Sequence, residues 1–461
     1  MRESDAFALH MERDPLLRST IVAVGVFDRA PEWPVLLERI DRATRLAPEF
    51  RDVLVPSPLG LVPPRWETDP AFDLSWHVRR MAAPAPHTLA PVLEFARTTG
   101  MTAFDPARPL WEFTLVEGLQ GGRAALVMKV HHSLTDGIGG IQIAAHVVDL
   151  ERELSDPGAM PPVPSGHRLS IAEQMRDTLE YNARRAGGTA RSLSRGASHA
   201  LRHPSRAVSD LVRTARSVGR MVQPVSHTLS PIMTQRKLLW HYDVLDVPLS
   251  ELRDAAHNVG GTLNDGFVGG IAGGLARYHE RHDAHVEELR LTMPISVRSE
   301  SDPEGGNRIT LARFKVPVGI EDPAARMTAI DELCRSWRHE PAIPYSDVIA
   351  GAMNLLPHAV TGSMLKHIDF LASNVPGFDL PVYLAGAELE SFYGFGPTIG
   401  SAANVTLMSY RDTCNVGVTT DAGAVPDPGV LMDCLREGFE EILDLSGDHR
   451  PVVLPVSGVV P

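Results

Sequence analysis

Two adjacent histidines, His131 and His132, are the residues of this chain best suited to chemistry, and they open the stretch His-His-Ser-Leu-Thr-Asp-Gly at 131–137. A histidine can take a proton from a hydroxyl at neutral pH, because its ordinary pKa is about 6.5. Asp136 could fix the loop or pair with a cation, and Gly137 would let the backbone turn sharply. The alternative is a strand-end loop with two structural histidines. Four fixed positions should match by chance only about once in a few hundred chains, so we favour a catalytic loop.

The residues around this stretch predict a strand, a loop and a helix. The apolar run at 124–130 is typical of a buried strand, and 138–148 begins flexibly before its pattern turns helical. Loops held by a rigid scaffold are common positions for catalytic groups. Adjacent side chains of a strand point to opposite faces, and no third ligand stands out, so we expect no metal site.

Composition limits the class of protein. The 461 residues are enough for two or three domains, and a net charge of −13 argues against nucleic-acid binding. Three scattered cysteines show no disulfide framework, which is typical of a reducing cytosol. The N-terminus lacks an apolar signal sequence, and no apolar run reaches the roughly 18 residues of a membrane span. We therefore expect a cytoplasmic protein whose membrane association, if any, is peripheral.

Strand and helix patterns recur along the chain and predict a mixed α/β (α+β) fold. We expect strands at 19–27, 74–78, 111–116, 123–130, 238–247, 289–291, 370–372, 402–410 and 414–419. We expect helices at 35–46, 89–98, 140–154, from about 248, at 267–278, 322–338 and 429–443.

Two helix starts contain residues that invite a capping interpretation. Ser250 could cap the helix that begins near 248, and the pair Asn264-Asp265 could cap the next one. Four glycines lie within 267–278, and each disfavours an isolated helix by about 1 kcal/mol relative to alanine. They indicate that something packs very close to this helix, either another element or a substrate tunnel.

The middle of the chain differs in composition from both ends. Residues 156–166 are rich in proline and glycine, and 167–225 contain eleven arginines, no lysine and only four acidic residues. Basic amphipathic helices are typical of membrane surfaces, and an arginine-rich connector between two domains is an equal alternative. We therefore divide the chain into an N-terminal domain at 1–155, a connector at 156–235 and a C-terminal domain at 236–461.

The stretch at 131–137 resembles the signature of acyltransferases built like chloramphenicol acetyltransferase, which include peptide-synthetase condensation domains and the bacterial wax ester synthase/diacylglycerol acyltransferase family. Further landmarks favour the last family and cover almost the whole chain. These landmarks are Pro109-Leu110-Trp111, Asn264-Asp265, Arg298, Ser373 to Gly377, and Ser409-Tyr410. The resemblance implies two chloramphenicol acetyltransferase-like domains with mixed sheets, joined by the helical arginine-rich connector, and a site in a channel between them.

The same resemblance implies an O-acyltransferase that moves a long-chain acyl group from acyl-coenzyme A to a lipid hydroxyl without a further cofactor. His132 would be the general base, and His131 would support the loop. Asn264 would polarise the acyl carbonyl or hold the oxyanion. Asp136 would pair with Arg298, whose forked guanidinium suits a buried carboxylate.

The remaining candidate residues have supporting or binding roles in this interpretation. Gly137 and Asp265 would support the site, and substrate contacts would come from Pro109, Leu110, Trp111, Ser373 and Asn374. For Pro109-Leu110-Trp111, an anchor at the start of a strand is an equal alternative. The acceptor would be diacylglycerol or a fatty alcohol, met at a membrane or lipid-droplet surface. The alternatives are a condensation or polyketide-associated acyltransferase and a non-catalytic lipid-binding protein of the same fold.

Overall fold

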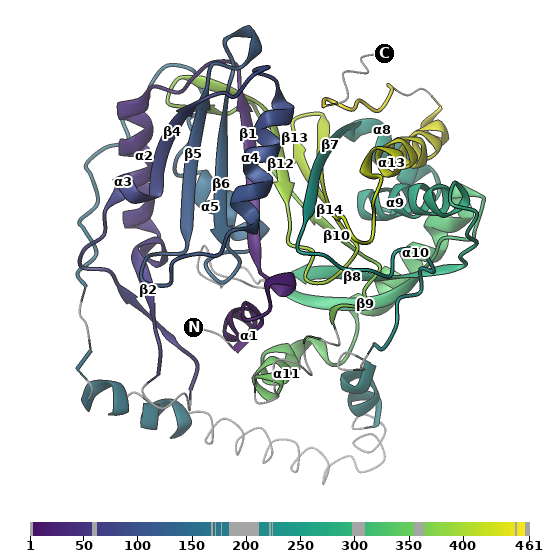
Figure 1. Cartoon of the computed structure of the whole chain (residues 1–461), viewed down its shortest axis with the longest axis horizontal. Helices are drawn as coiled ribbons and strands as arrows, with labels where there is room; N and C mark the ends of the chain where they lie inside the picture. The colour runs from purple at the N-terminus through teal and green to yellow at the C-terminus, as the bar shows by residue number, and fades with distance from the viewer. Residues whose placement is uncertain are drawn as a thin grey trace.

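The computed structural model of the chain contains two six-stranded mixed sheets and a two-stranded hairpin, surrounded by helices (Figure 1). The structure describes residues 3–57, 62–166, 169–170, 172–176, 178–183, 212–220, 223, 225–296, 309–354, 362, 365–447 and 450–456. The mixed α+β architecture predicted from the sequence is confirmed.

The first sheet has the order β11-β12-β1-β6-β5-β4. Of its pairs of neighbouring strands, only β4 and β5 are parallel, and the other pairs are antiparallel. Its strands are β1 (Thr20–Phe27), β4 (Val78–Ala82), β5 (Trp111–Glu117), β6 (Ala124–His131), β11 (Tyr383–Leu384) and β12 (Ala387–Phe395). Two of these strands come from the C-terminal half of the chain, because β12 pairs with β1 from Val22↔Phe395 to Phe27↔Leu389. The segment at 383–395, which we placed in the C-terminal domain, therefore completes the N-terminal sheet.

The second sheet has the order β7-β14-β13-β10-β8-β9, in which β10 runs parallel to both of its neighbours. Its strands are β7 (Trp240–Pro248), β8 (Glu288–Ser296), β9 (Ile309–Pro317), β10 (Phe370–Val375), β13 (Ala403–Tyr410) and β14 (Thr413–Asp421). The hairpin consists of β2 (Asp52–Val55) and β3 (Arg65–Thr68).

The helices form an N-terminal and a C-terminal set. Those of the N-terminal part are α1 (Glu3–Met11), α2 (Trp33–Leu46), α3 (Leu74–His77), α4 (Leu89–Met101) and α5 (Gly137–Ala144). Those of the C-terminal part are α8 (Leu249–Asn258), α9 (Leu263–Glu280), α10 (Pro323–Arg338), α11 (Ser346–Met353) and α13 (Pro428–Leu443). Short 3-10 turns occupy Pro15–Leu17, Pro48–Arg51, Gln120–Gly122, Ile343–Tyr345 and Asp444–Ser446. Helix α4 packs between the sheets, where its Val92 and Leu93 share an apolar cluster with Val22 of β1 and Tyr242 of β7.

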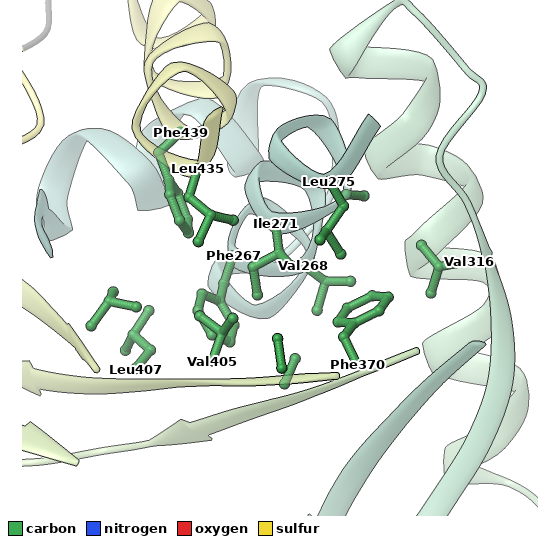
Figure 2. Close-up of a cluster of buried hydrophobic side chains, with 14 of the residues drawn as sticks. Phe267, Val268, Ile271, Leu275, Val316, Phe370, Val405, Leu407, Leu435 and Phe439 are labelled. Carbon is green, nitrogen blue, oxygen red and sulfur yellow. The ribbon is translucent and has the colours of Figure 1, made fainter. Parts of the chain in front are cut away.

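The largest apolar cluster lies between the second sheet and helices α8, α9, α10 and α13. Figure 2 shows Phe267 and Ile271 of α9 between Phe439 of α13 and the sheet residues Val405 and Phe370. Burial of these side chains orders the second sheet, because apolar area removed from water stabilises by roughly 25 cal/mol per Å². The second sheet thus has one face packed by helices, which leaves its other face for contacts with the rest of the protein.

The glycines of α9 are explained by another helix rather than by a substrate tunnel. A Cβ atom on Gly270 would lie 2.5 Å from Cδ1 of Phe439, and one on Gly274 would lie 2.7 Å from Cα of Leu435. Gly438 of α13 is under the same restriction, since a Cβ atom there would lie 2.4 Å from the Gly270 carbonyl oxygen. The close packing predicted from the sequence is therefore confirmed, with α13 as the partner at Gly270 and Gly274 and α10 at Gly269, where a Cβ atom would lie 2.8 Å from Cγ of Met327.

Replacing Gly270 by alanine should lower the free energy of unfolding by about 1–3 kcal/mol, because the new methyl group overpacks a buried contact. This loss should exceed the gain of about 1 kcal/mol in helix propensity. Gly429→Ala in α13 is the matched control, since its Cβ would have no atom within 4 Å. Urea unfolding of both variants measures the difference, and an equal stability for the two would contradict this account of the packing.

Two elements differ from the sequence expectation, one because of a local cap and the other because of a contact distant in the chain. Residues 74–78 were expected as a strand, but 74–77 form α3, whose first turn is capped by Asp73 accepting the Ser75 N–H at 2.9 Å. The helix expected at 140–154 ends at Ala144. It cannot continue, because the Asp149 backbone pairs with Tyr383 at 2.7 and 2.8 Å. Short apolar runs leave strand and helix ambiguous until such partners are known.

Ser250 is not the helix cap that the sequence suggested. Pro248 occupies the N-cap position of α8, and the Ser250 backbone N–H donates to Asp412 Oδ1 at 3.3 Å. A carboxylate from the turn between β13 and β14 therefore satisfies this donor.

The connector is described only in part, since 184–211 lie outside the described residues. Residues 212–220 are helical and contact the C-terminal half, where Ser217 Oγ accepts the Ala342 N–H at 2.8 Å and Arg220 pairs with Glu340. This part of the segment packs as a connector would, and the lipid-surface role stays a prediction. Among the described residues, no helix has both the length and the apolar composition of a membrane-spanning helix.

Candidate active site

A cavity of about 440 Å³ is lined by residues of both sheets. Its wall includes one face of β1, β5, β6 and β12, residues of β9, β10 and β13, and helices α1, α2, α5 and α11. Most of the lining side chains are apolar. The volume lies within the range of about 300–1,000 Å³ that is usual for ligand sites. The arrangement therefore offers a long apolar space whose few polar groups would fix the orientation of a bound molecule.

His132 follows β6 directly and faces this cavity. Side chains of a strand alternate, and Leu126, Met128, Val130 and His132 all line the cavity. The imidazole is half-buried, and its Nδ1 has no hydrogen-bond partner among the described residues. Burial lowers the pKa of His132 below its ordinary value, although the charge of Asp136 opposes this shift. The imidazole is therefore neutral at pH 7 and available to accept a proton.

His131 points to the opposite side of the sheet and is held by hydrogen bonds. Its Nδ1 accepts the Ser133 backbone N–H at 3.1 Å and lies 2.6 Å from Ser133 Oγ. A backbone N–H is always a donor, so the ring proton is assigned to Nε2, which donates to Glu12 Oε1 at 3.2 Å. Burial would raise the pKa of Glu12, but hydrogen bonds from His131 and the Ser19 backbone, with nearby positive charge, lower it. Among the described residues, His132 thus keeps Nδ1 without a hydrogen-bond partner, whereas both ring nitrogens of His131 are hydrogen-bonded.

Asp136 and Gly137 shape the loop after the histidines. Asp136 caps α5, since its Oδ1 accepts the Gly139 N–H at 2.7 Å. A Cβ atom on Gly137 would lie 2.7 Å from Cγ2 of Val375 in β10. Gly137 was expected to allow a sharp turn, but its φ is not positive, and close approach of β10 is what requires glycine here. The predicted partner of Asp136, Arg298, lies outside the described residues.

The segment from Ser373 to Gly377 contains the end of β10 and the residues that follow it. Ser373 lines the cavity, whereas Asn374 is not among the lining residues and, by strand alternation, faces the other side of β10. The Gly377 N–H donates to Ser409 Oγ at 3.1 Å. Tyr410 is buried, and its hydroxyl donates to the Leu389 carbonyl at 2.8 Å. The landmarks Ser409-Tyr410 therefore fasten β12 and the loop to the second sheet.

Pro109-Leu110-Trp111 leads into β5 and anchors the start of this strand, while its role in substrate contact stays a prediction. Leu110 anchors the motif strand, because its carbonyl accepts the His131 N–H at 2.9 Å. Trp111 is fully buried, donates from Nε1 to the Phe50 carbonyl at 2.7 Å, and also lines the cavity. Pro109 and Leu110 are buried and are not among the lining residues.

Asn264 and Asp265 lie in the first turn of α9 and play different parts. Thr262 is the N-cap, and Asp265 completes a capping box by accepting the Thr262 N–H at 2.8 Å. The Asn264 amide lies 3.7 Å from the Met293 sulfur and 3.8 Å from the Cys334 sulfur. Asn264 is not among the residues that line the cavity, so its role as an oxyanion donor stays a prediction.

Sequence reasoning missed several polar residues of the cavity wall. Asn404 and Thr406 of β13 line it and are joined by a hydrogen bond from Thr406 Oγ1 to Asn404 Oδ1 at 3.2 Å. Their alternation with apolar neighbours in an otherwise buried strand was the available signal. Arg313 of β9 also lines the cavity. Among the described residues, no three histidine, cysteine or acidic side chains gather as metal ligands would.

The chain is similar in sequence to a known protein family. The model of the wax ester synthase/diacylglycerol acyltransferase catalytic domain matches residues 1–267, and that of the WS/DGAT C-terminal domain matches 305–443. A Mycobacterium tuberculosis protein named as a putative diacylglycerol O-acyltransferase is 37% identical over 97% of this chain and 92% of its own length. The O-acyltransferase WSD of Acinetobacter baylyi is 27% identical over 81% of this chain and 82% of its own.

Solved structures share the fold. The wax ester synthase/diacylglycerol acyltransferase from Marinobacter aquaeolei VT8 superposes with a TM-score of 0.65 and 22% identity, covering 96% of this chain and 98% of that one. A starter condensation domain of rhizomide synthetase, solved with C8-CoA and Leu-SNAC, gives a TM-score of 0.61 and 15% identity, with coverage of 99% and 95%. Both likenesses extend over nearly the whole chain and therefore include both sheets.

Proposed function

Because this chain belongs to the wax ester synthase/diacylglycerol acyltransferase family and is an acyltransferase, we propose that it moves a long-chain acyl group from acyl-coenzyme A to a lipid hydroxyl. The observation that carries the proposal is the position of His132. A neutral imidazole with a free nitrogen lies in the wall of an apolar cavity, where an acyl chain and a lipid alcohol could both be desolvated. The acceptor is diacylglycerol or a fatty alcohol, reached at a membrane or droplet surface from the cytoplasm.

The chemistry needs few groups, since a thioester is already activated. His132 removes the hydroxyl proton as the oxygen attacks the thioester carbonyl, and the same imidazole then protonates the departing thiolate of coenzyme A. Hydrogen-bond donors must hold the developing oxyanion, and one such donor is typically worth about 3 kcal/mol of barrier. Asn264 is our candidate donor. Its amide would first move away from the sulfurs of Met293 and Cys334. Both substrates are bound together, and no acyl-enzyme forms.

Support for the loop comes from groups that do not touch the reacting atoms. Asp136 caps α5 and, in the proposal, pairs with Arg298. His131 ties the end of β6 to Glu12, and the Ser19 carbonyl accepts the His132 N–H at 2.9 Å. This network holds the base in one orientation, which is where much of the rate advantage of an enzyme arises.

Transfer from labelled palmitoyl-coenzyme A by the purified protein tests the function. Diacylglycerol and hexadecanol are offered in parallel, with His132→Ala as the control. Product with either acceptor, lost in the variant, supports the proposal, and the ratio of products identifies the acceptor. Folded protein that is inactive with both would instead favour a carrier-tethered acceptor or a non-catalytic lipid-binding role. A trapped acyl-enzyme would contradict the ternary-complex mechanism.

The pH dependence follows from the direction of the His132 pKa shift. The base works only when neutral, so kcat/KM should fall as the pH drops through its pKa. Burial lowers this pKa, and the acid limb should therefore lie below 6.5, with a rate that levels off above the limb. A pH profile of palmitoyl transfer measures the limb, and the residual rate of His132→Ala should lack it. Half-maximal activity above pH 6.5 would be inconsistent with His132 as the base.

A further inference from the structure

Arg313 carries a positive charge into the wall of the cavity, and no described residue supplies an acidic partner for it. It lies on β9, the edge strand of the second sheet, and is half-buried. Its Nε is buried with no hydrogen-bond partner, and Nη1 has a long bond of 3.4 Å to the Gln223 carbonyl. Among the described residues, no carboxylate lies within ion-pair distance of it. Burial, together with the charge of Arg290, lowers the pKa of Arg313 to about 10, so it is still charged at pH 7.

Two neighbours on β8 extend this unsatisfied cluster. Thr292 is directly opposite Arg313 in the β8–β9 ladder, and its buried Oγ1 also has no hydrogen-bond partner among the described residues. Arg290 lies two positions earlier on the same face, and its Nη1 donates to the His227 and His367 carbonyls, at 2.9 and 3.0 Å. This is the face of the sheet that points away from the helical layer, since Leu289, Leu291 and Met293 alternate into the core.

An unpaired buried cation is costly, and each orphaned donor adds to the cost. The buried cation and the unpaired donors are both stabilised when an anion with several acceptor oxygens binds beside them. The guanidinium fork and the hydroxyl then make charge-assisted hydrogen bonds to it. The rest of the cavity wall is mainly apolar, which suits an acyl chain. Arg313 lines the cavity, so this part of the wall is suited to the charged part of a ligand.

We propose that Arg313, assisted by Thr292 and Arg290, binds a phosphate group of the acyl-coenzyme A donor. This inference rests on the proposed function, which supplies a ligand with an apolar chain, a thioester and a phosphate-rich head. The contact with Arg313 orients the acyl donor, so that its phosphates lie against β8 and β9 while its thioester reaches His132 at the end of β6. A fatty-acid carboxylate is the other anion of suitable chemistry, and the experiment separates the two.

The test combines substitution in the protein with truncation of the donor. Palmitoyl-coenzyme A, palmitoyl-dephospho-coenzyme A and palmitoyl-pantetheine retain the thioester but lose phosphates in steps. Arg313→Gln should raise KM for palmitoyl-coenzyme A by about ten- to a hundredfold and leave KM for palmitoyl-pantetheine unchanged. The donor at which the effect disappears identifies the phosphate. Thr292→Val, which keeps the shape and removes the hydroxyl, should give a smaller change in the same direction.

Lys315→Gln is the matched control, because Lys315 lies on the same face of β9 but is exposed and paired with Glu288 at 2.8 Å. It should leave KM for all three donors unchanged. An equal rise of KM for every donor with Arg313→Gln, or no change at all, would overturn the proposal. A loss of affinity for palmitate rather than for coenzyme A would assign the site to a carboxylate and overturn it as well.

Calorimetry of the binding of unacylated coenzyme A tests this inference independently of the proposed acyl transfer. If the folded protein transfers no acyl group, tight binding of coenzyme A that Arg313→Gln weakens and Lys315→Gln does not would still support the site. Equal binding by all three proteins would reject it. A melting temperature for Arg313→Gln close to that of the wild type shows that the fold is intact in these measurements.

Discussion

Replacing His132 by glutamine is expected to lower kcat for acyl transfer by about 10²- to 10⁴-fold, the usual contribution of a general base. Glutamine is similar in size and polarity but cannot take the hydroxyl proton. KM for the acyl donor should change little, because His132 occupies a small part of a cavity wall that is otherwise apolar. The thermal stability should also be retained, since Nδ1 of His132 has no hydrogen bond to any described residue that would be lost. Steady-state kinetics with the better of the two acceptors measures the effect.

His131→Gln is the matched control, because the same residue type is changed one position earlier on the same strand. His131 is hydrogen-bonded to Ser133 and Glu12 and faces away from the cavity. Its loss should therefore reduce stability by about 1–3 kcal/mol, as expected for a buried network with a charged member, while kcat falls less than tenfold. If the folded His131 variant lost kcat as completely as the His132 variant, the division of labour between them would be wrong.

Gly137→Ala should lower kcat/KM by about 10²-fold, because a displacement of about 1 Å near a catalytic base is enough for such a loss. The new Cβ would lie 2.7 Å from Cγ2 of Val375, so β10 and the histidine loop must separate. Overpacking of this contact should also cost about 1–3 kcal/mol of stability. Kinetics and urea unfolding of the same variant measure both effects.

Two further variants test whether the contact with Val375 causes the losses expected for Gly137→Ala. Val375→Ala in the Gly137→Ala background removes the clashing methyl groups and should restore most of the lost stability. Gly140→Ala, within the same helix, has only Thr135 Cγ2 at 3.9 Å from its Cβ and should be neutral or stabilising by about 1 kcal/mol. A Gly137→Ala protein as stable as wild type, or one that Val375→Ala fails to improve, would show that close approach of β10 is not the reason for this glycine.

Much of the candidate site could be predicted from the sequence. The histidine pair, the strand before it and the opposite directions of its two side chains follow from residue types and a period of two, which act over a few neighbouring residues. The glycines of α9 likewise predicted a closely packed partner, since their helix-disfavouring cost needs compensation. The mixed fold and the family followed from the order of such local motifs along the chain.

Other features were decided by contacts between residues distant in sequence. The pattern at 387–395 predicts no pairing partner, and its place beside β1 depends on a ladder between residues more than 360 positions apart, such as Val22 and Phe395. The requirement for Gly137 comes from Val375, more than two hundred residues later, and not from backbone conformation. From its sequence position Arg313 is an ordinary strand arginine, and only the fold places it beside Thr292 with no carboxylate of the described residues paired to it. Residue types and spacing thus determined which groups can react, whereas packing of the two sheets decided which of them share a cavity, because pairing and exclusion of water depend on the whole chain.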